Sequence, residues 1–146
     1  MANLLRPTAI ALSLVFLGSC AAHKAPDPHA QKLVETIAAE HKDVTRPSVH
    51  AKPAGKTDYI YIASTEASRR AKTSDPEDLK AIQTGQMVVL EENGGFDVTV
   101  PICQMNSAYT AAAGVTFKPG VAREAAVAQA KAIASSLNSG MMTPKK

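Results

Sequence analysis

The segment from Gln86 to Cys103 constrains the fold most, because it reads as two strands joined by a tight turn. Residues 86–92 are rich in aliphatic side chains, and residues 96–103 alternate between apolar and polar side chains. Asn93-Gly94-Gly95 lies between them, and an Asn-Gly pair favours the two-residue turn of a β-hairpin. The sequence therefore predicts antiparallel strand pairing in this part of the chain.

Three further segments have the composition of strands. They are Ser48–Lys52, Asp58–Ser64 and about Ala108–Lys118. Three segments have helical spacing of apolar residues or begin with a helix cap. The first is Asp27–Asp43, and Thr45-Arg46-Pro47 should end it. The second is a short helix that begins at Ser74-Asp75-Pro76 and ends at Gly85. The third is Val121–Asn138, and Gly140 should cap it. This order predicts an α+β fold with a single antiparallel sheet of about five strands, flanked by an N-terminal and a C-terminal helix.

The composition limits the domain count and the class of partner. A chain of 146 residues fits one domain. Because it has no Trp and only three Tyr and three Phe, its core must be aliphatic. A net charge of +3, with scattered basic residues, is too small to indicate binding of nucleic acid.

Residues 1–22, MANLLRPTAIALSLVFLGSCAA, have the pattern of an export signal. Arg6 supplies the positive charge, and the apolar run Ala9–Leu17 is too short to cross a bilayer as a helix. Leu17-Gly18-Ser19-Cys20 resembles a bacterial lipobox, which implies that Cys20 is acylated and becomes the first mature residue. The alternative is an ordinary signal that is cleaved near Ala22.

We therefore expect a signal peptide of the lipoprotein type at 1–19, a tether at 20–28, the folded domain at 29–140 and a tail at 141–146. Two or more acyl chains anchor a protein stably to a membrane. The expected location is the periplasmic face of a bacterial membrane, and Ala21 after Cys20 favours the outer membrane. Cys103 then has no disulfide partner and is expected to be buried.

The stretch from Ile62 to Leu79, IASTEASRRAKTSDPEDL, contains the strongest candidates for a binding site. Its acidic half is explained by a helix start, in which Asp75 caps and Asp78 takes the capping-box position. Its basic half has no such explanation. Cations near a helix N-terminus suit an anionic ligand, although surface ion pairs of little energetic value would also account for them.

Two tyrosines add to this candidate site. Tyr59, Tyr61 and Ala63 alternate along the predicted strand and should share one face. Such a pair suits a small-molecule pocket and equally suits the outer face of a sheet. The candidate ligand-binding residues are Tyr59, Tyr61, Arg69, Arg70 and Lys72, with Tyr109 as a further candidate.

Several short motifs, taken together, resemble a known family. They are Tyr61-Ile-Ala-Ser-Thr65, Arg69-Arg-Ala-Lys72, Ser74-Asp-Pro-Glu-Asp-Leu79, Thr84-Gly85, Val100-Pro-Ile102 and Ala113-Gly-Val-Thr-Phe117. Over about residues 30–138 their order is similar to a single Cache domain, a PAS-like extracytoplasmic sensor. The resemblance implies a pocket for a small molecule. Thr65 and Ala71 stand where the family pattern has Asn and Gly, and residues 104–108 lack its acidic turn, which argues against an amine ligand held at that turn.

Two functions from different classes follow from these patterns. The first is a lipid-anchored extracytoplasmic module that binds a small organic acid or another small molecule and has no signalling domain of its own. The alternative is an envelope lipoprotein with a structural or interaction role and no small ligand. An enzyme is not expected, because the sequence contains no known catalytic motif. Cys103 with the distant His50 or His41 is the only combination of nucleophile and base that it offers. Neither a cofactor nor a metal is expected, since His23 and His29 lack a third ligand nearby.

Overall fold

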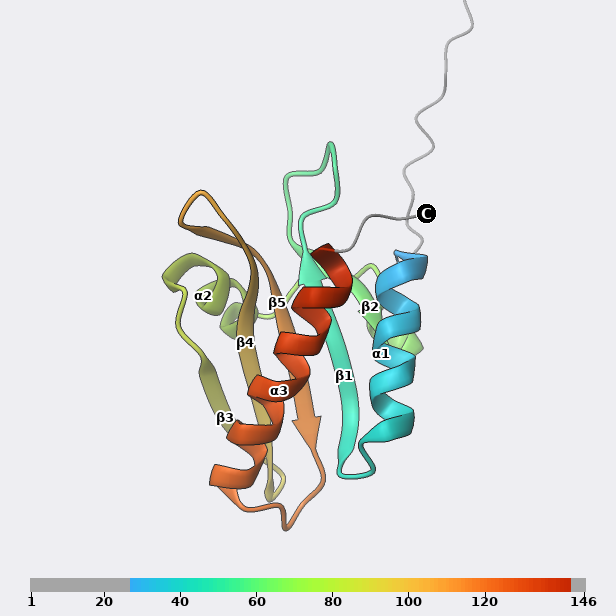
Figure 1. Cartoon of the computed structure of the whole chain (residues 1–146), viewed down its shortest axis with the longest axis vertical. Helices are drawn as coiled ribbons and strands as arrows, with labels where there is room; N and C mark the ends of the chain where they lie inside the picture. Colours follow the sequence, from blue (N-terminus) through green and yellow to red (C-terminus); the bar gives the residue numbers. More distant parts are fainter. Residues whose placement is uncertain (1–26, 143–146) are drawn as a thin grey trace, which may run out of the picture.

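The structure is a computed structural model that describes residues 27–142. The expected signal peptide, the lipobox and the first residues of the tether lie outside the described residues, as do the last four residues of the chain. The elements follow in the order α1 Pro28–Glu40, β1 Val44–Ala51, β2 Ile60–Ser64, the 3₁₀ turn η1 Ala67–Arg69, α2 Pro76–Thr84, β3 Val88–Glu92, β4 Gly95–Met105, β5 Ala108–Phe117 and α3 Arg123–Met142 (Figure 1).

The strands form one antiparallel sheet in the order β2-β1-β5-β4-β3. This confirms the α+β fold and the five-stranded sheet predicted from the sequence. Asn93 and Gly94 have positive φ values of 51° and 75° at the β3–β4 turn, as the Asn-Gly signal requires. Asn106 and Ser107, at 49° and 67°, form a second tight turn of this kind between β4 and β5.

Helices α1 and α3 cover one face of the sheet, and α2 covers the other (Figure 1). The core under α1 and α3 is aliphatic, as the composition predicted. It includes Val34, Ile37, Val98, Val115, Ile133 and Leu137. Under α2, by contrast, the buried residues of the sheet include Ser48, His50 and Thr99. The two faces therefore differ in chemistry, and the polar one lies next to the candidate site.

The prediction for the end of the first helix was wrong. Helix α1 ends at Glu40, and Thr45-Arg46-Pro47 belongs to β1, where Arg46 pairs with Thr116 and Pro47 with Val115. The register shifts between Val44 and Arg46, and an irregularity of this kind lets a strand accept proline. The Asp27 cap was predicted correctly, since its carboxylate accepts hydrogen bonds from the backbone N–H groups of His29 and Ala30.

The role predicted for Gly140 was also wrong. Helix α3 continues through Gly140 to Met142, into the segment predicted as a tail. A Cβ at Gly140 would lie 2.8 Å from Leu33 Cδ1, and the Gly140 carbonyl lies 2.9 Å from His29 Nε2. Gly140 therefore lies inside α3, where it faces the Leu33 side chain of α1, and not at a helix end. No helix between residues 27 and 142 is long and apolar enough to span a bilayer.

Candidate functional site

The N-terminus of α2 is built as its sequence predicted. Asp75 is the N-cap and Pro76 occupies the first turn. The Asp78 carboxylate accepts a hydrogen bond of 3.0 Å from the backbone N–H of Asp75, which is the return arm of a capping box. Gly85 ends the helix in the left-handed conformation, with φ at 68°. These local interactions hold Asp75 and Asp78 at the same helix end.

A pocket of about 290 Å³ opens beside this helix end and is called the Tyr61 pocket below. Its lining consists of Tyr61, Glu66, Ser68, Arg69, Lys72, Thr73 and Asp75. Three of the five predicted ligand-binding residues, Tyr61, Arg69 and Lys72, therefore lie together.

Tyr61, Arg69 and Asp75 form a closed hydrogen-bonded triangle in this pocket. The Tyr61 hydroxyl donates to Asp75 Oδ2 at 2.6 Å, and Arg69 Nη1 donates to the same oxygen at 2.7 Å and to the Tyr61 oxygen at 3.0 Å. Burial raises the pKa of the Tyr61 hydroxyl, and its bond to Asp75 raises it further, so the hydroxyl keeps its proton. The triangle fixes Tyr61 and Arg69 in one arrangement.

The charged residues of the lining are two cations, Arg69 and Lys72, and two carboxylates, Glu66 and Asp75, so their formal charges balance. Asp75 pairs with Arg69, and Glu66 pairs at 3.1 Å with Arg46, which lies outside the lining. Within residues 27–142 no ion pair holds the exposed Lys72. Because both carboxylates already have cationic partners, the charge that the pocket offers to a ligand is the positive charge of Lys72.

The loop that carries Arg69 and Lys72 is held against the outer edge of β2. The Ala71 N–H donates to the Tyr61 carbonyl at 2.9 Å, and the Tyr61 N–H donates to the Lys72 carbonyl at 2.9 Å. Ala71 takes a left-handed φ of 62°, a conformation that glycine adopts with less strain. Glycine at position 71 would therefore adopt this conformation with less strain than the alanine present.

The other two predicted residues do not reach this pocket. Arg70 Nε donates to the Ser64 carbonyl at 2.8 Å and so supports the end of β2. Tyr59 precedes β2 and lines a separate pocket of about 300 Å³ with Tyr109, the further candidate. The five residues are therefore divided between two pockets and a backbone contact.

The prediction that Tyr61 and Ala63 share a face was wrong. A register shift between Val49 and His50 makes Ala63 pair with Val49 while Tyr61 pairs with His50. Ala63 consequently joins the aliphatic core on the α1 and α3 side, and Tyr61 stays on the α2 side. One irregularity in strand pairing breaks the alternation on which the prediction depended.

A buried polar network behind Tyr61 was not predicted. His50 is 1% exposed, and its Nε2 lies 2.9 Å from Ser48 Oγ. Its Nδ1 lies 3.0 Å from Asp78 Oδ2 and 3.2 Å from Ser74 Oγ. The Tyr61 ring packs on the imidazole, with 4.1 Å between the ring centroids. Ser48 and His50 are two residues apart in a strand, which was a usable sign that they share a face.

Burial sets the protonation of this network. It lowers the pKa of His50 to about 3, against the opposing charge of Asp75. It raises the pKa of Asp78 to about 7, although the N–H of Asp75 and the Thr99 hydroxyl both favour the carboxylate. Near pH 5 the His50–Asp78 pair therefore holds one proton between its two members.

His50 lies between Ser48 and Asp78, as the histidine of a Ser-His-Asp triad lies between its serine and its aspartate. Ser48, however, is not accessible to a substrate. Ser48 is 3% exposed, and a Cβ added to Gly114 would lie 2.5 Å from its Oγ. Cys103 packs in the core on the α1 and α3 side, so it is not brought to His50. Among residues 27–142 there is no group of three or more side chains suited to a metal ion. The network joins α2 to the sheet, and its His50 ring packs against the Tyr61 ring.

Comparison with solved structures shows the type of fold. One similar structure is the GAF domain from an Acinetobacter phosphoenolpyruvate-protein phosphotransferase, with 16% identity over 77% of this chain and 87% of that chain and a TM-score of 0.54. Another is the type II free methionine-R-sulfoxide reductase from Thermoplasma acidophilum, with 8% identity over 80% of this chain and 92% of that chain and a TM-score of 0.53. An IclR homolog from Microbacterium hydrocarbonoxydans, solved in complex with 4-hydroxybenzoate, is also similar (10% identity, 77% and 66%, TM-score 0.51).

At these identities the likeness concerns the fold alone, which is of the GAF/PAS type. No protein-family model and no curated protein matches the chain.

Proposed function

We propose that this chain is an exported, lipid-anchored, sensor-like domain of the Cache type that binds a small organic acid in the Tyr61 pocket. The observation that carries the proposal is the convergence of Tyr61, Arg69 and Lys72 on one pocket whose carboxylates are already paired. The fold adds support, because the IclR homolog of similar fold was solved with 4-hydroxybenzoate. The proposal includes no catalytic step.

The pocket also defines the size and polarity of the ligand. A volume of about 290 Å³ lies at the lower limit of ordinary ligand sites, which favours a compact molecule. The Lys72 ammonium would hold the ligand carboxylate, and the hydroxyls of Ser68 and Thr73 offer hydrogen bonds to further polar groups. Tyr61 and Arg69, fixed by Asp75, would form a rigid wall that needs little ordering on binding.

A thermal-shift screen of residues 27–146 tests this proposal. The panel contains small carboxylates, amino acids, amines and sugars. A ligand at about 100 times its Kd stabilises the folded state by about 2.7 kcal/mol, which raises Tm by several degrees. We expect a hit among the carboxylates that is lost in Lys72→Gln and kept in Lys80→Gln, an exposed lysine of α2 outside the pocket lining. A hit that neither Lys72→Gln nor Tyr61→Phe weakens would contradict the site.

The alternative is an envelope lipoprotein with an interaction role and no small ligand. One observation favours it, because Asp75 and Tyr61 already satisfy Arg69 without a ligand. A panel that gives no shift, together with the capture of a defined envelope protein by the full chain, would favour this function over ligand binding.

A further inference from the structure

The end of the domain at which α1 begins carries unusual apolar exposure. Met105 and Met142 are 57% and 56% exposed, and they are the exposed large apolar side chains among residues 27–142. Met105 lies at the β4–β5 turn and Met142 at the end of α3. Figure 1 shows that this turn, the end of α3, the β1–β2 loop and the start of α1 lie at one end of the long axis.

Hydrogen bonds and a shared pocket join these segments. His29 Nε2, in the first turn of α1, lies 2.9 Å from the Gly140 carbonyl near the end of α3. Asn138 of α3 accepts a hydrogen bond of 2.7 Å from the Cys103 N–H of β4. Gln104 and Met142 line one pocket of about 390 Å³. The start of α1, the end of α3 and the last residues of β4 therefore form one continuous surface.

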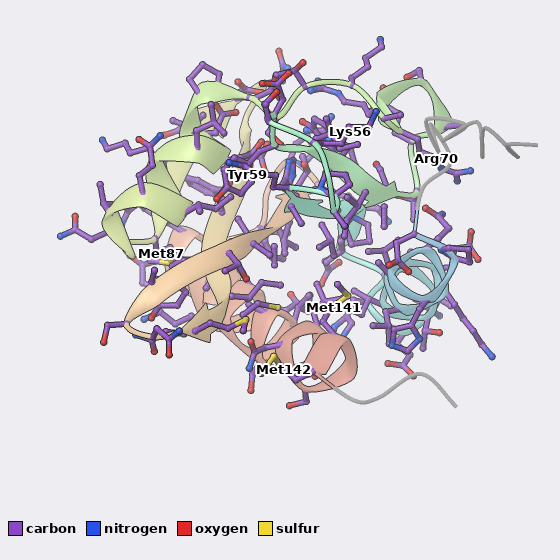
Figure 2. The ribbon with its side chains drawn as sticks, turned by 90° about the horizontal axis from the view of Figure 1, so that it is seen from above. Lys56, Tyr59, Arg70, Met87, Met141 and Met142 are labelled. Carbon is purple, nitrogen blue, oxygen red and sulfur yellow. The ribbon has the colours of Figure 1, made fainter. Side chains whose placement is uncertain are left out.

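Amphipathic side chains accompany the two methionines. Tyr59 and Tyr109 line a pocket together with Ser107 and Ala108 of the β4–β5 hairpin. The Lys52 Nζ lies 5.0 Å from the centre of the Tyr59 ring. Figure 2 looks down on this end and shows Lys56, Tyr59, Met141 and Met142 around it.

This combination has the composition of a membrane interface. Tyrosines are enriched at the level of lipid headgroups, and lysines are attracted to anionic lipids. The β1–β2 loop carries the exposed Lys52 and Lys56 against a single acid, Asp58.

The length of the tether determines which end can face a membrane. If Cys20 is acylated, six residues separate it from Asp27. The tether then spans at most roughly 25 Å when fully extended. Helix α3 has 20 residues and runs along the domain for roughly 30 Å. Turning the far end onto the bilayer would carry the start of α1 beyond the reach of the tether.

We propose that the surface formed by Met105, Met142, Tyr59, Tyr109 and Lys56 docks on the anionic bilayer that holds the lipid at Cys20. This inference rests on the lipid anchor of the proposed function and adds the face that meets the membrane. The tether keeps the domain at a high local concentration beside the bilayer, so a small apolar contact suffices for docking. The far end, which includes Lys118 and Gly120, then points away from the membrane.

Single tryptophans test the docking, because the chain has none of its own. The variants are Met105→Trp, Met142→Trp and the matched control Lys118→Trp, which replaces an exposed residue at the far end. The full chain is purified from bacterial membranes and reconstituted into phosphatidylethanolamine and phosphatidylglycerol vesicles, with and without brominated acyl chains. We expect the emission of the first two variants to move to shorter wavelength and to be quenched by bromine, and that of the control to change in neither way.

The outcomes separate the anchor from the docking. An acyl mass on Cys20 with quenching of Met105→Trp and Met142→Trp alone supports both. An acylated protein in which all three variants are quenched equally, or not at all, overturns the docking and leaves the anchor and the ligand site standing. A chain without an acyl mass that does not float with the vesicles overturns the anchor and the docking, but not ligand binding in the Tyr61 pocket.

Discussion

Replacing Asp78 by Asn should change how the stability of the domain depends on pH, and the change follows from the burial of two groups. In the folded protein the pKa of His50 is about 3 and that of Asp78 is about 7. The pair therefore holds one proton between these values. In the unfolded chain the ordinary pKa values of 6.5 and 3.8 also leave one proton on the pair between pH 3.8 and 6.5. Over that range the pair contributes no slope to the free energy of unfolding.

Each single variant removes this compensation. In Asp78→Asn, His50 stays neutral when folded and takes up a proton when unfolded below its ordinary pKa of 6.5. The unfolded state then binds one more proton, so stability rises with pH by about 1.4 kcal/mol per pH unit. In His50→Gln, Asp78 stays protonated when folded and ionises when unfolded above its ordinary pKa of 3.8. The folded state then binds one more proton, and stability falls with rising pH at about the same slope.

Urea unfolding of residues 27–146 at several values between about pH 4.5 and about pH 6 measures these slopes. The native protein, both single variants and the double variant Asp78→Asn with His50→Gln are compared as differences from the native protein, so that all other titrating groups cancel. We expect slopes of opposite sign for the single variants and none for the double variant. Parallel curves for all four proteins would refute the argument that burial controls the protonation of this pair.

Three further predictions concern single positions. Gly114→Ala should destabilise the domain by about 2–4 kcal/mol in urea unfolding, because its Cβ would lie 2.5 Å from Ser48 Oγ. A loss below about 1 kcal/mol would show that the strands shift to accommodate the methyl group. Ala71→Gly should raise stability by about 0.5 kcal/mol, since it relieves a left-handed φ of 62°, and a loss of stability would contradict that conformation. Cys103 is buried, and burial raises the pKa of its thiol. Iodoacetamide should therefore label it slowly in the folded protein and quickly in urea. Fast labelling of the folded protein would indicate an accessible thiol.

Local interactions were readable from the sequence because the residues that make them are neighbours along the chain. The Asp27 cap, the Asp75 and Asp78 capping box and the Asn93-Gly94 turn each depend on side chains and backbone groups within a few residues. The alternation of apolar residues around these signals then predicted the single antiparallel sheet with a helix at each end. The hydrogen bond from Arg69 to Asp75, the N-cap of α2, also joins residues that are close along the chain.

The contacts that shape the candidate site depend on tertiary structure. His50, Ser74 and Asp78 come from a strand, a loop and a helix, and they meet because α2 packs on the polar face of the sheet. The register shift that separates Tyr61 from Ala63 depends on how β2 pairs with β1, which a linear pattern does not contain.

The contact between Gly140 of α3 and Leu33 of α1 likewise depends on tertiary packing. The sequence by itself therefore determined the elements and their order, since these follow from short-range hydrogen bonds and periodicity. The tertiary structure decided which polar side chains are buried together, because burial and the pKa shifts that it causes depend on groups brought together from distant parts of the chain.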